Sequence, residues 1–170
     1  MSSDVPMSLH PIQQHHFRRV CAKFATGITV VTVLNAAGEP EGMTVNSFTS
    51  VSLEPPLVLF CADFRTRLLE HLDSGKRIGI NVLREDQKEI STRFATPGAD
   101  RFDGVEWFRG ETGVPVLKDM LATLECEICR VVEAGDHAVM VCQVHHATWS
   151  DGPPLIYFNS SYRALNSPSE

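Results

Sequence analysis

Two long strand-like segments near the end of the chain constrain the fold more than any other feature of the sequence. Over residues 122–132, apolar side chains fall on alternate positions, so that Leu124, Cys126 and Ile128 share one face of an extended strand. A second such segment covers residues 138–149, and the turn sequence Ala-Gly-Asp-His at 134–137 separates the two. The pattern predicts a long β-hairpin, and with it a mainly β fold.

Shorter segments predict further strands and a few helices. Apolar and β-branched residues predict strands at residues 28–34, 42–48, 57–62, 77–83, 155–158 and 161–165. Helical spacing of apolar residues predicts helices at 11–25, 66–74 and 85–94. Residues 52–56 and 95–113 are expected to be loops, the second of which holds three aromatic side chains. Many strands with short connections, and helices outside them, predict a β-barrel with peripheral helices.

Length and charge limit the number of domains and the kinds of partner. The 170 residues suit a single domain, which we place at 11–165 between flexible tails at 1–10 and 166–170. The formal net charge of −6 argues against a nucleic-acid partner, because such proteins need a basic surface. No apolar run approaches the roughly 20 residues that span a bilayer, so we expect no membrane association. The five scattered cysteines indicate reduced thiols in a cytoplasmic protein.

Common metal and catalytic motifs give no positive signal. Cys126 and Cys129 match the C-x-x-C pattern, but residues three apart on a strand face opposite sides and cannot share a metal or a disulfide. His15 and His16, and likewise His145 and His146, are neighbours that point in different directions. The sequence also lacks the G-x-S-x-G, G-x-x-x-x-G-K-[ST] and G-x-G-x-x-G motifs. We therefore expect no metal site, and the Rossmann, P-loop and α/β-hydrolase classes are disfavoured.

A segment rich in neutral polar residues is the first candidate for a binding site. Residues 42–52 hold six side chains that donate or accept hydrogen bonds without charge: Thr44, Asn46, Ser47, Thr49, Ser50 and Ser52. A ligand ring with both carbonyl and N–H groups requires such partners. An exposed edge strand with Ser and Thr facing water is the alternative interpretation.

Two other segments offer charged groups. Ala62 to Arg67 joins a predicted buried strand to a predicted helix, where free N–H groups, Thr66 and an arginine could bind a phosphate. His137 lies at the tip of the predicted hairpin beside Asp136, where it could meet a ligand. The alternatives are a capping threonine with solvated arginines, and a polar turn.

Together these segments resemble the flavin reductase-like family over about residues 17–165. The resemblance rests on FATGITVVT at 24–32, GMT at 42–44, NSFTSVSL at 46–53 and PPLV at 55–58. Shorter matches follow in the family's order: INVL at 80–83, RFA at 93–95, DRF at 100–102, LEC at 124–126, AGDH at 134–137, PLIY at 154–157 and YR at 162–163. Many relatives have a small residue near position 65, where this chain has Phe64 and Arg65. The resemblance implies a split β-barrel of the FMN-binding type that forms a homodimer, in which the apolar residues between 102 and 121 would find burial.

The resemblance also implies a set of cofactor-binding residues. The flavin ring and ribityl chain would lie along Thr44, Asn46, Ser47, Phe48, Thr49, Ser50, Val51 and Ser52. Ala62, Arg65 and Thr66 would approach the phosphate, and Arg93 and Phe94 would close the flavin site. His137 and Tyr162 would line the nicotinamide side.

The implied activity is transfer of a hydride from NADH or NADPH to N5 of FMN or FAD. The cofactors supply the reactivity, and the protein contributes proximity, about 7–11 kcal/mol of barrier in well-aligned cases. No catalytic side chain is required. Backbone N–H groups at residues 46–50 are the candidates to stabilise the charge on the reduced flavin. The net negative charge of the chain and the lack of a basic cluster near residues 135–137 favour NADH over NADPH.

The family also suggests what the reduced flavin serves. Its members include the small reductase components of two-component flavin-dependent monooxygenases, so the resemblance implies such a partner. Two alternatives stay open at this point. One is a flavoprotein of the same fold that reduces another acceptor, such as ferric iron or a corrinoid. The other is a flavin-binding protein without catalytic activity.

Overall fold

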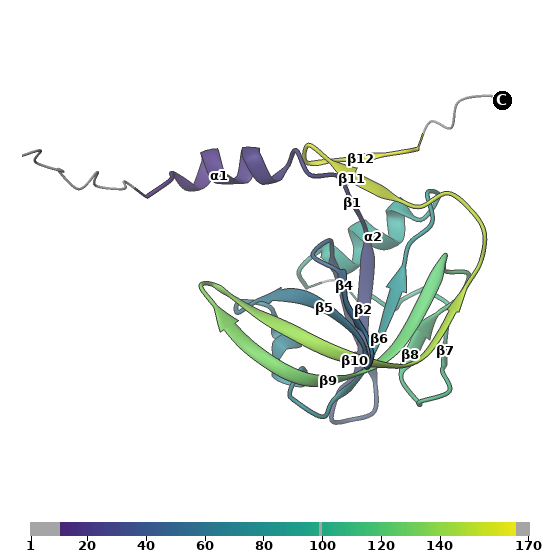
Figure 1. Ribbon diagram of the computed structural model, residues 1–170. Helices are drawn as coiled ribbons and strands as arrows, with labels where there is room; N and C mark the ends of the chain where they lie inside the picture. Colours follow the sequence, from purple (N-terminus) through teal and green to yellow (C-terminus); the bar gives the residue numbers. More distant parts are fainter. Residues whose placement is uncertain (1–10, 99, 166–170) are drawn as a thin grey trace, which may run out of the picture.

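A seven-stranded antiparallel sheet forms the body of the protein (Figure 1). The computed structural model describes residues 11–98 and 100–165, so the tails predicted at 1–10 and 166–170 lie outside the described residues. The strands of the sheet are β2 (Thr29–Leu34), β3 (Pro40–Val45), β4 (Thr49–Leu53), β5 (Pro56–Asp63), β6 (Arg77–Val82), β9 (Ala122–Ala134) and β10 (His137–Trp149). Their order across the sheet is β3-β2-β6-β9-β10-β5-β4.

The hairpin of β9 and β10 confirms the strongest sequence prediction. Each strand has 13 residues, and Ala134 at the end of β9 pairs with His137 at the start of β10. Cys126 is buried, whereas Cys129 is exposed beside an irregularity in the pairing. The two thiols are therefore separated as predicted, and all five cysteines are free. Burial raises the pKa of the Cys126 thiol to about 12, so this group stays protonated at neutral pH.

Two hydrophobic clusters lie on opposite faces of β2. Val31 and Val33 point into the barrel, where they join a cluster that includes Phe60, Ile80 and Met140. Val30 faces outward into a second cluster of buried residues, which are Ile28, Val30, Leu83, Phe94, Leu117, Met120 and Leu155. This arrangement explains why apolar residues at 28–34 do not alternate with exposed polar ones, since a strand covered on both faces shows no alternation.

The barrel is split along one side, as the fold prediction requires. The terminal strands of the sheet, β3 and β4, are joined in sequence at Asn46–Phe48 but have no paired residues between them. A side chain anchors the connection between them. The Ser47 hydroxyl accepts the Cys61 N–H at 2.9 Å and lies 3.3 Å from the Cys61 carbonyl oxygen. The connection is thus held to β5 by one serine, next to the backbone pairs that join β4 to β5.

Smaller elements surround the main sheet. A three-stranded sheet joins β1 (Thr26–Gly27), β11 (Ile156–Phe158) and β12 (Ser161–Arg163), and a two-stranded sheet joins β7 (Trp107–Arg109) and β8 (Pro115–Leu117). The helices are α1 (Gln14–Cys21), α2 (Lys88–Ala95) and the short 3₁₀ helix η1 (Arg67–His71). Among the described residues, no helix is long and apolar enough to cross a membrane.

Several predicted element bounds were wrong. The helix predicted at 11–25 ends at Cys21, because the chain turns and then enters β1. The helix predicted at 66–74 is the 3₁₀ helix η1, in which the Leu69 N–H bonds to Thr66 three residues back. The helix predicted at 85–94 begins only at Lys88, after a turn in which the Gln87 side chain accepts the Arg84 N–H.

Three predicted non-helical regions also differ. The strand predicted at 42–48 ends at Val45, where the chain leaves the sheet to cross the split. The loop predicted at 52–56 starts later, because Ser52 and Leu53 belong to edge strand β4. The loop predicted at 95–113 contains β7. Both β4 and β7 are short and mostly exposed, so neither produces a clear apolar alternation.

Helix α1 extends away from the barrel (Figure 1) and buries none of its residues. Phe17 and Val20 on this helix, and Phe24 just after it, are more than half exposed. The sequence analysis placed unburied apolar residues at 102–121 instead. There, only Phe108 is a large apolar side chain with high exposure, because Phe102, Trp107 and their neighbours pack against the outer cluster. The α1 segment is therefore one of the places with exposed apolar side chains, and Leu53 and Trp149 are others.

Candidate flavin and nicotinamide site

A cavity of about 1080 Å³ opens at the split of the barrel. Its walls come from β3, the Asn46–Ser47 connection, the end of β5, the start of η1 and the segment that follows α2. Eight of the fifteen predicted binding residues line it: Thr44, Asn46, Ser47, Ala62, Arg65, Thr66, Phe94 and His137. Residues up to about 90 positions apart in the sequence therefore line one cavity.

The other seven predicted residues do not line this cavity. They are Phe48, Thr49, Ser50, Val51, Ser52, Arg93 and Tyr162. Phe48 packs against the barrel core, and residues 49–52 lie on edge strand β4. Arg93 is exposed and donates to the Asp103 carbonyl at 2.6 Å.

Tyr162 lies behind the cavity wall and is linked to it through one residue of α2. Its hydroxyl is 2.9 Å from the hydroxyl of Ser91, a fully buried residue. The carbonyl of the same Ser91 accepts the Thr44 hydroxyl at 2.7 Å. Ser91 therefore fixes both a cavity-lining threonine and a tyrosine of the small three-stranded sheet.

The neutral side chains of the 42–52 segment differ in what they can still bind. The hydroxyl protons of Thr44 and Ser47 are within reach of backbone carbonyls, which orients both groups. Asn46 is exposed, and its amide has no hydrogen-bond partner in the described part of the chain. An amide presents donors and an acceptor side by side. Asn46 is therefore the cavity group best placed to bond a ring that carries both carbonyl and N–H groups.

The segment predicted to bind phosphate has a different local structure. Asp63 accepts from the Arg65 side chain at 3.0 and 2.6 Å and from the Arg65 N–H at 2.8 Å. The hydrogen bonds from Arg65 hold the pKa of the Asp63 carboxyl well below its usual range, and in return the pKa of Arg65 is raised. Thr66 makes no capping hydrogen bond, and η1 has only five residues. The charge of Arg65 is thus compensated by its own neighbour.

His137 occupies the cavity rim at the start of β10. Its Nδ1 lies 2.7 Å from an Asp136 carboxylate oxygen, and its backbone pairs with Asp63 across the sheet. The hydrogen bond with His137 lowers the pKa of Asp136, which therefore stays ionised. With Nδ1–H donated to Asp136, the neutral ring leaves Nε2 as an acceptor. The side chain is 41% exposed, so a ligand in the cavity can reach it.

Arg101 is the functional candidate that the sequence analysis missed. It lines the cavity from the segment after α2, and its Nη1 donates to the Gly42 carbonyl on β3. Its Nε and Nη2 each lie 3.4 Å from the Thr96 carbonyl. Burial lowers the pKa of Arg101, and nearby Glu41 opposes this effect. The residue lies inside the Asp-Arg-Phe motif at 100–102, but that motif alone says nothing about where the side chain points.

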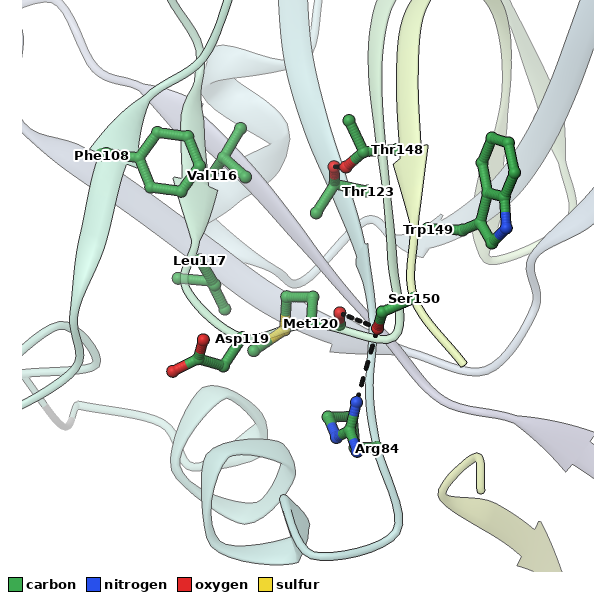
Figure 2. Close-up of a pocket in the computed structure, with 10 residues that line it drawn as sticks. All are labelled: Arg84, Phe108, Val116, Leu117, Asp119, Met120, Thr123, Thr148, Trp149 and Ser150. Atoms are coloured by element: carbon green, nitrogen blue, oxygen red, sulfur yellow. Dashed lines mark hydrogen bonds between the residues drawn. The ribbon is translucent and has the colours of Figure 1, made fainter. Parts of the chain in front are cut away.

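A second, smaller cavity of about 520 Å³ lies outside the barrel (Figure 2). It shares no lining residue with the larger cavity and contains none of the predicted site residues. Its cation, Arg84, lies 3.4 Å from both the Ser150 hydroxyl and the Asp151 carbonyl. Among the residues that the structure describes, no cluster of three or more His, Cys, Asp or Glu is placed to hold a metal ion. The larger cavity is therefore the candidate site.

The open barrel and the cavity at its split define a split-barrel protein of the flavin reductase type. The family model described as "Flavin reductase like domain" matches residues 21–166, and the chain belongs to this family. The resemblance found in the sequence is thereby confirmed.

Solved structures and curated relatives agree with this assignment. The NADH:FAD oxidoreductase of Streptomyces globisporus, solved with NAD and FAD fragments, is 37% identical and has a TM-score of 0.86. The match covers 92% of this chain and 95% of that one. A flavin-dependent monooxygenase reductase subunit of Mycobacterium tuberculosis is 36% identical over 91% of this chain and 83% of its own length.

Longer relatives are more similar in sequence but only partly covered. A Rhizobium meliloti protein named "Probable flavin reductase" is 50% identical over 71% of this chain, and the match spans 39% of its own length. The stachydrine N-demethylase reductase subunit of the same organism is 43% identical over 75% of this chain and 55% of its own length. The chain thus spans about half the length of these two relatives or less.

Proposed function

We propose that this chain is a flavin reductase that uses NADH to reduce FMN or FAD. One observation carries the proposal: a single open cavity gathers Thr44, Asn46, Ser47 and His137 in a fold shared with an oxidoreductase solved with NAD and FAD fragments. Three curated relatives are named for NADH, one as an FAD reductase, one as an FMN reductase and one as a flavin reductase.

The residues at the cavity fit a flavin. The cavity volume of about 1080 Å³ lies just above the range of about 300–1,000 Å³ that is usual for ligand sites. The oriented hydroxyls of Thr44 and Ser47 and the exposed Asn46 amide are neutral, as the ring requires. Phe94 is fully buried and supplies an apolar wall. These features support binding of the ring beside the Asn46–Ser47 connection.

A bound flavin supplies the ring that accepts a hydride, and this chain supplies alignment. Asn46 binds the polar edge of the ring, while Thr44 and Ser47 keep the wall in place through their bonds to Ser91 and Cys61. His137, which also lines the cavity, would contact the reduced nicotinamide through Nε2. Ala62 and Thr66 border the ribityl and phosphate end. The proposed roles of Arg93, Tyr162 and residues 48–52 rest on the family resemblance.

The proposal extends to the assembly in which the enzyme works. Several relatives are reductase subunits of monooxygenases, which supports a monooxygenase that consumes the reduced flavin. Exposed apolar side chains on the α1 segment support a homodimer, because a stable monomer rarely leaves such a segment uncovered. Five free thiols support a cytoplasmic location.

A steady-state assay that crosses NADH and NADPH with FMN, FAD and riboflavin tests the activity. We expect flavin-dependent oxidation of the nicotinamide and a higher kcat/KM with NADH. Flavin binding without nicotinamide oxidation would instead identify a protein that only binds flavin. Oxidation that requires ferric iron or a corrinoid would identify a reductase of another acceptor.

A further inference from the structure

We propose that Arg101 is the residue that binds phosphate in the cavity at the split, in place of Arg65. The inference rests on the proposed function, because it assigns part of the same cavity. The ligand group is a phosphate oxyanion, which FMN carries at the end of its ribityl chain and NADH carries in its diphosphate.

Three charged groups that line the cavity form no ion pair among the described residues: Asp100, Arg67 and Arg101. Arg65 is held by Asp63 through its side chain and its N–H, and His137 is paired with Asp136. Two further arginines line the cavity, Arg67 and Arg101, and neither has a carboxylate within salt-bridge distance in the described residues. A dianionic group that enters the cavity is therefore attracted to these two positions.

The side chain of Arg101, unlike that of Arg67, is held in place by hydrogen bonds. Its guanidinium bridges the Gly42 carbonyl on β3 and the Thr96 carbonyl at the end of α2. Neutral carbonyls fix the orientation of the group without compensating its charge. Arg67 is exposed on η1 and makes no side-chain hydrogen bond with the described residues, so binding would have to order it. Ordering a long side chain costs about 0.5–1.5 kcal/mol of affinity, which favours the fixed arginine.

Partial burial strengthens the preference for Arg101. Because the guanidinium has lost part of its solvation, an incoming phosphate restores a favourable environment and is screened less than at the surface. Glu41 is the acidic side chain that influences it, and the Asn35 amide already donates to Glu41 at 3.0 Å. Arg65, in contrast, would have to break its bonds to Asp63 before it could bind a phosphate with both amino groups.

Phosphate-free analogues separate this role from a structural one. Dissociation constants for FMN and riboflavin are measured by fluorescence titration for the wild type, Arg101→Met, Arg101→Lys and Arg65→Met. A second series compares the KM for NADH with that for dihydronicotinamide riboside. Arg109→Met is the matched control, since Arg109 also donates to carbonyls, those of Gly38 and Gly113, but lies outside the cavity.

We expect Arg101→Met to weaken binding of the phosphate-bearing ligand about tenfold or more in one series, and binding of its phosphate-free analogue less than about twofold. If the flavin series changes, Arg101 binds the phosphate of FMN, and if the nicotinamide series changes, it binds the diphosphate of NADH. Arg101→Lys should retain part of the preference for the phosphate-bearing ligand, and Arg65→Met and Arg109→Met should retain all of it.

The inference is overturned if Arg101→Met weakens both members of each pair equally, because that is the pattern of a structural bridge between Gly42 and Thr96. It is also overturned if Arg101→Met leaves the ratio of the two constants unchanged in both series, or if Arg65→Met is the variant that loses the preference for the phosphate-bearing ligand. A wild type that binds neither flavin nor reduced nicotinamide removes the proposed function and this inference together. If the wild type binds both, and the ratio between each phosphate-bearing ligand and its phosphate-free analogue is the same in Arg101→Met as in the wild type, only this inference is removed.

Discussion

The hydroxyl of Ser47 bonds to the backbone N–H of Cys61, and so anchors the connection between β3 and β4 to β5. Both residues line the cavity. Removing this hydrogen bond leaves the Cys61 N–H without that partner. Loss of a partner for a buried or half-buried donor costs about 1–3 kcal/mol.

We therefore expect Ser47→Ala to lower the free energy of unfolding by about 1–2 kcal/mol and to weaken flavin binding as well. Urea denaturation and fluorescence titration measure the two effects. Ser74→Ala is the control, since Ser74 is exposed between η1 and β6 and does not line the cavity. Equal stability of the two variants would show that anchoring of the β3–β4 connection does not depend on Ser47.

Asn46→Leu should weaken flavin binding about tenfold while the fold stays intact, because the amide is exposed and serves no hydrogen bond within the described protein. The flavin dissociation constant and the thermal midpoint are measured on the same preparation. An unchanged dissociation constant would contradict the placement of the flavin ring.

His137→Ala should raise the KM for NADH more than it lowers kcat, the pattern of lost binding that is equal in the ground and transition states. The side chain lies at the rim, where it can hold the nicotinamide without taking part in proton transfer. Flavin affinity should change little. If the variant keeps the wild-type KM, or loses flavin, His137 has another role.

The stability of the β7–β8 region should depend on pH through Glu125. Its buried carboxylate accepts the Glu111 N–H at 3.0 Å, the Thr112 N–H at 2.6 Å and the Thr112 hydroxyl at 2.7 Å. Burial raises the pKa of Glu125, but the hydrogen bonds from Thr112 and Glu111 outweigh it, and the pKa lies below its ordinary value of 4.5. The stabilisation is thus complete above about pH 4.5 and is lost as pH falls through the folded pKa.

Urea midpoints of the wild type and Glu125→Gln, measured between pH 7 and pH 3, test this prediction. We expect the wild type to be the more stable protein at pH 7 and the difference to shrink below about pH 4.5. Glu127→Gln is the control, as Glu127 lies on the same strand and is less buried. A difference that does not vary with pH would assign the effect to packing.

Phe24→Asp should convert the proposed dimer to a monomer. The Phe24 side chain is 77% exposed and lies between α1 and β1, where a second copy would cover it. Sedimentation equilibrium at micromolar concentration measures the mass, and the exposed Phe108→Asp variant serves as the control for an apolar-to-acidic change elsewhere. A wild-type mass of 18.8 kDa would remove the dimer.

Sequence patterns predicted the strands that are buried on at least one face, and missed edge strand β4, which is mostly exposed. The β9–β10 hairpin alternates, and β2 is rich in apolar residues because both of its faces are covered. Edge strand β4 shows only exposed or half-exposed residues, so its pattern is that of a loop. The bounds of α1 depend on where β1 finds its partner β11, about 130 residues away.

About half of the predicted site residues line the cavity, and most of the others belong to edge strand β4 or lie just before it. Neutral residues such as Thr44 and Asn46 came to line the cavity because they follow β3 to its end. Arginines are harder to place, since their long side chains reach partners that the sequence does not indicate. Arg65 turns back to Asp63 two residues away, and Arg101 crosses to Gly42, 59 residues away.

The double role of Ser91 ties the cavity wall to the outermost part of the molecule. Its carbonyl anchors Thr44, its hydroxyl meets Tyr162, and Tyr162 belongs to the small sheet that also contains β1, the continuation of the α1 arm. Two hydrogen bonds of one buried serine therefore connect the small sheet, which the arm enters through β1, to a threonine that lines the cavity.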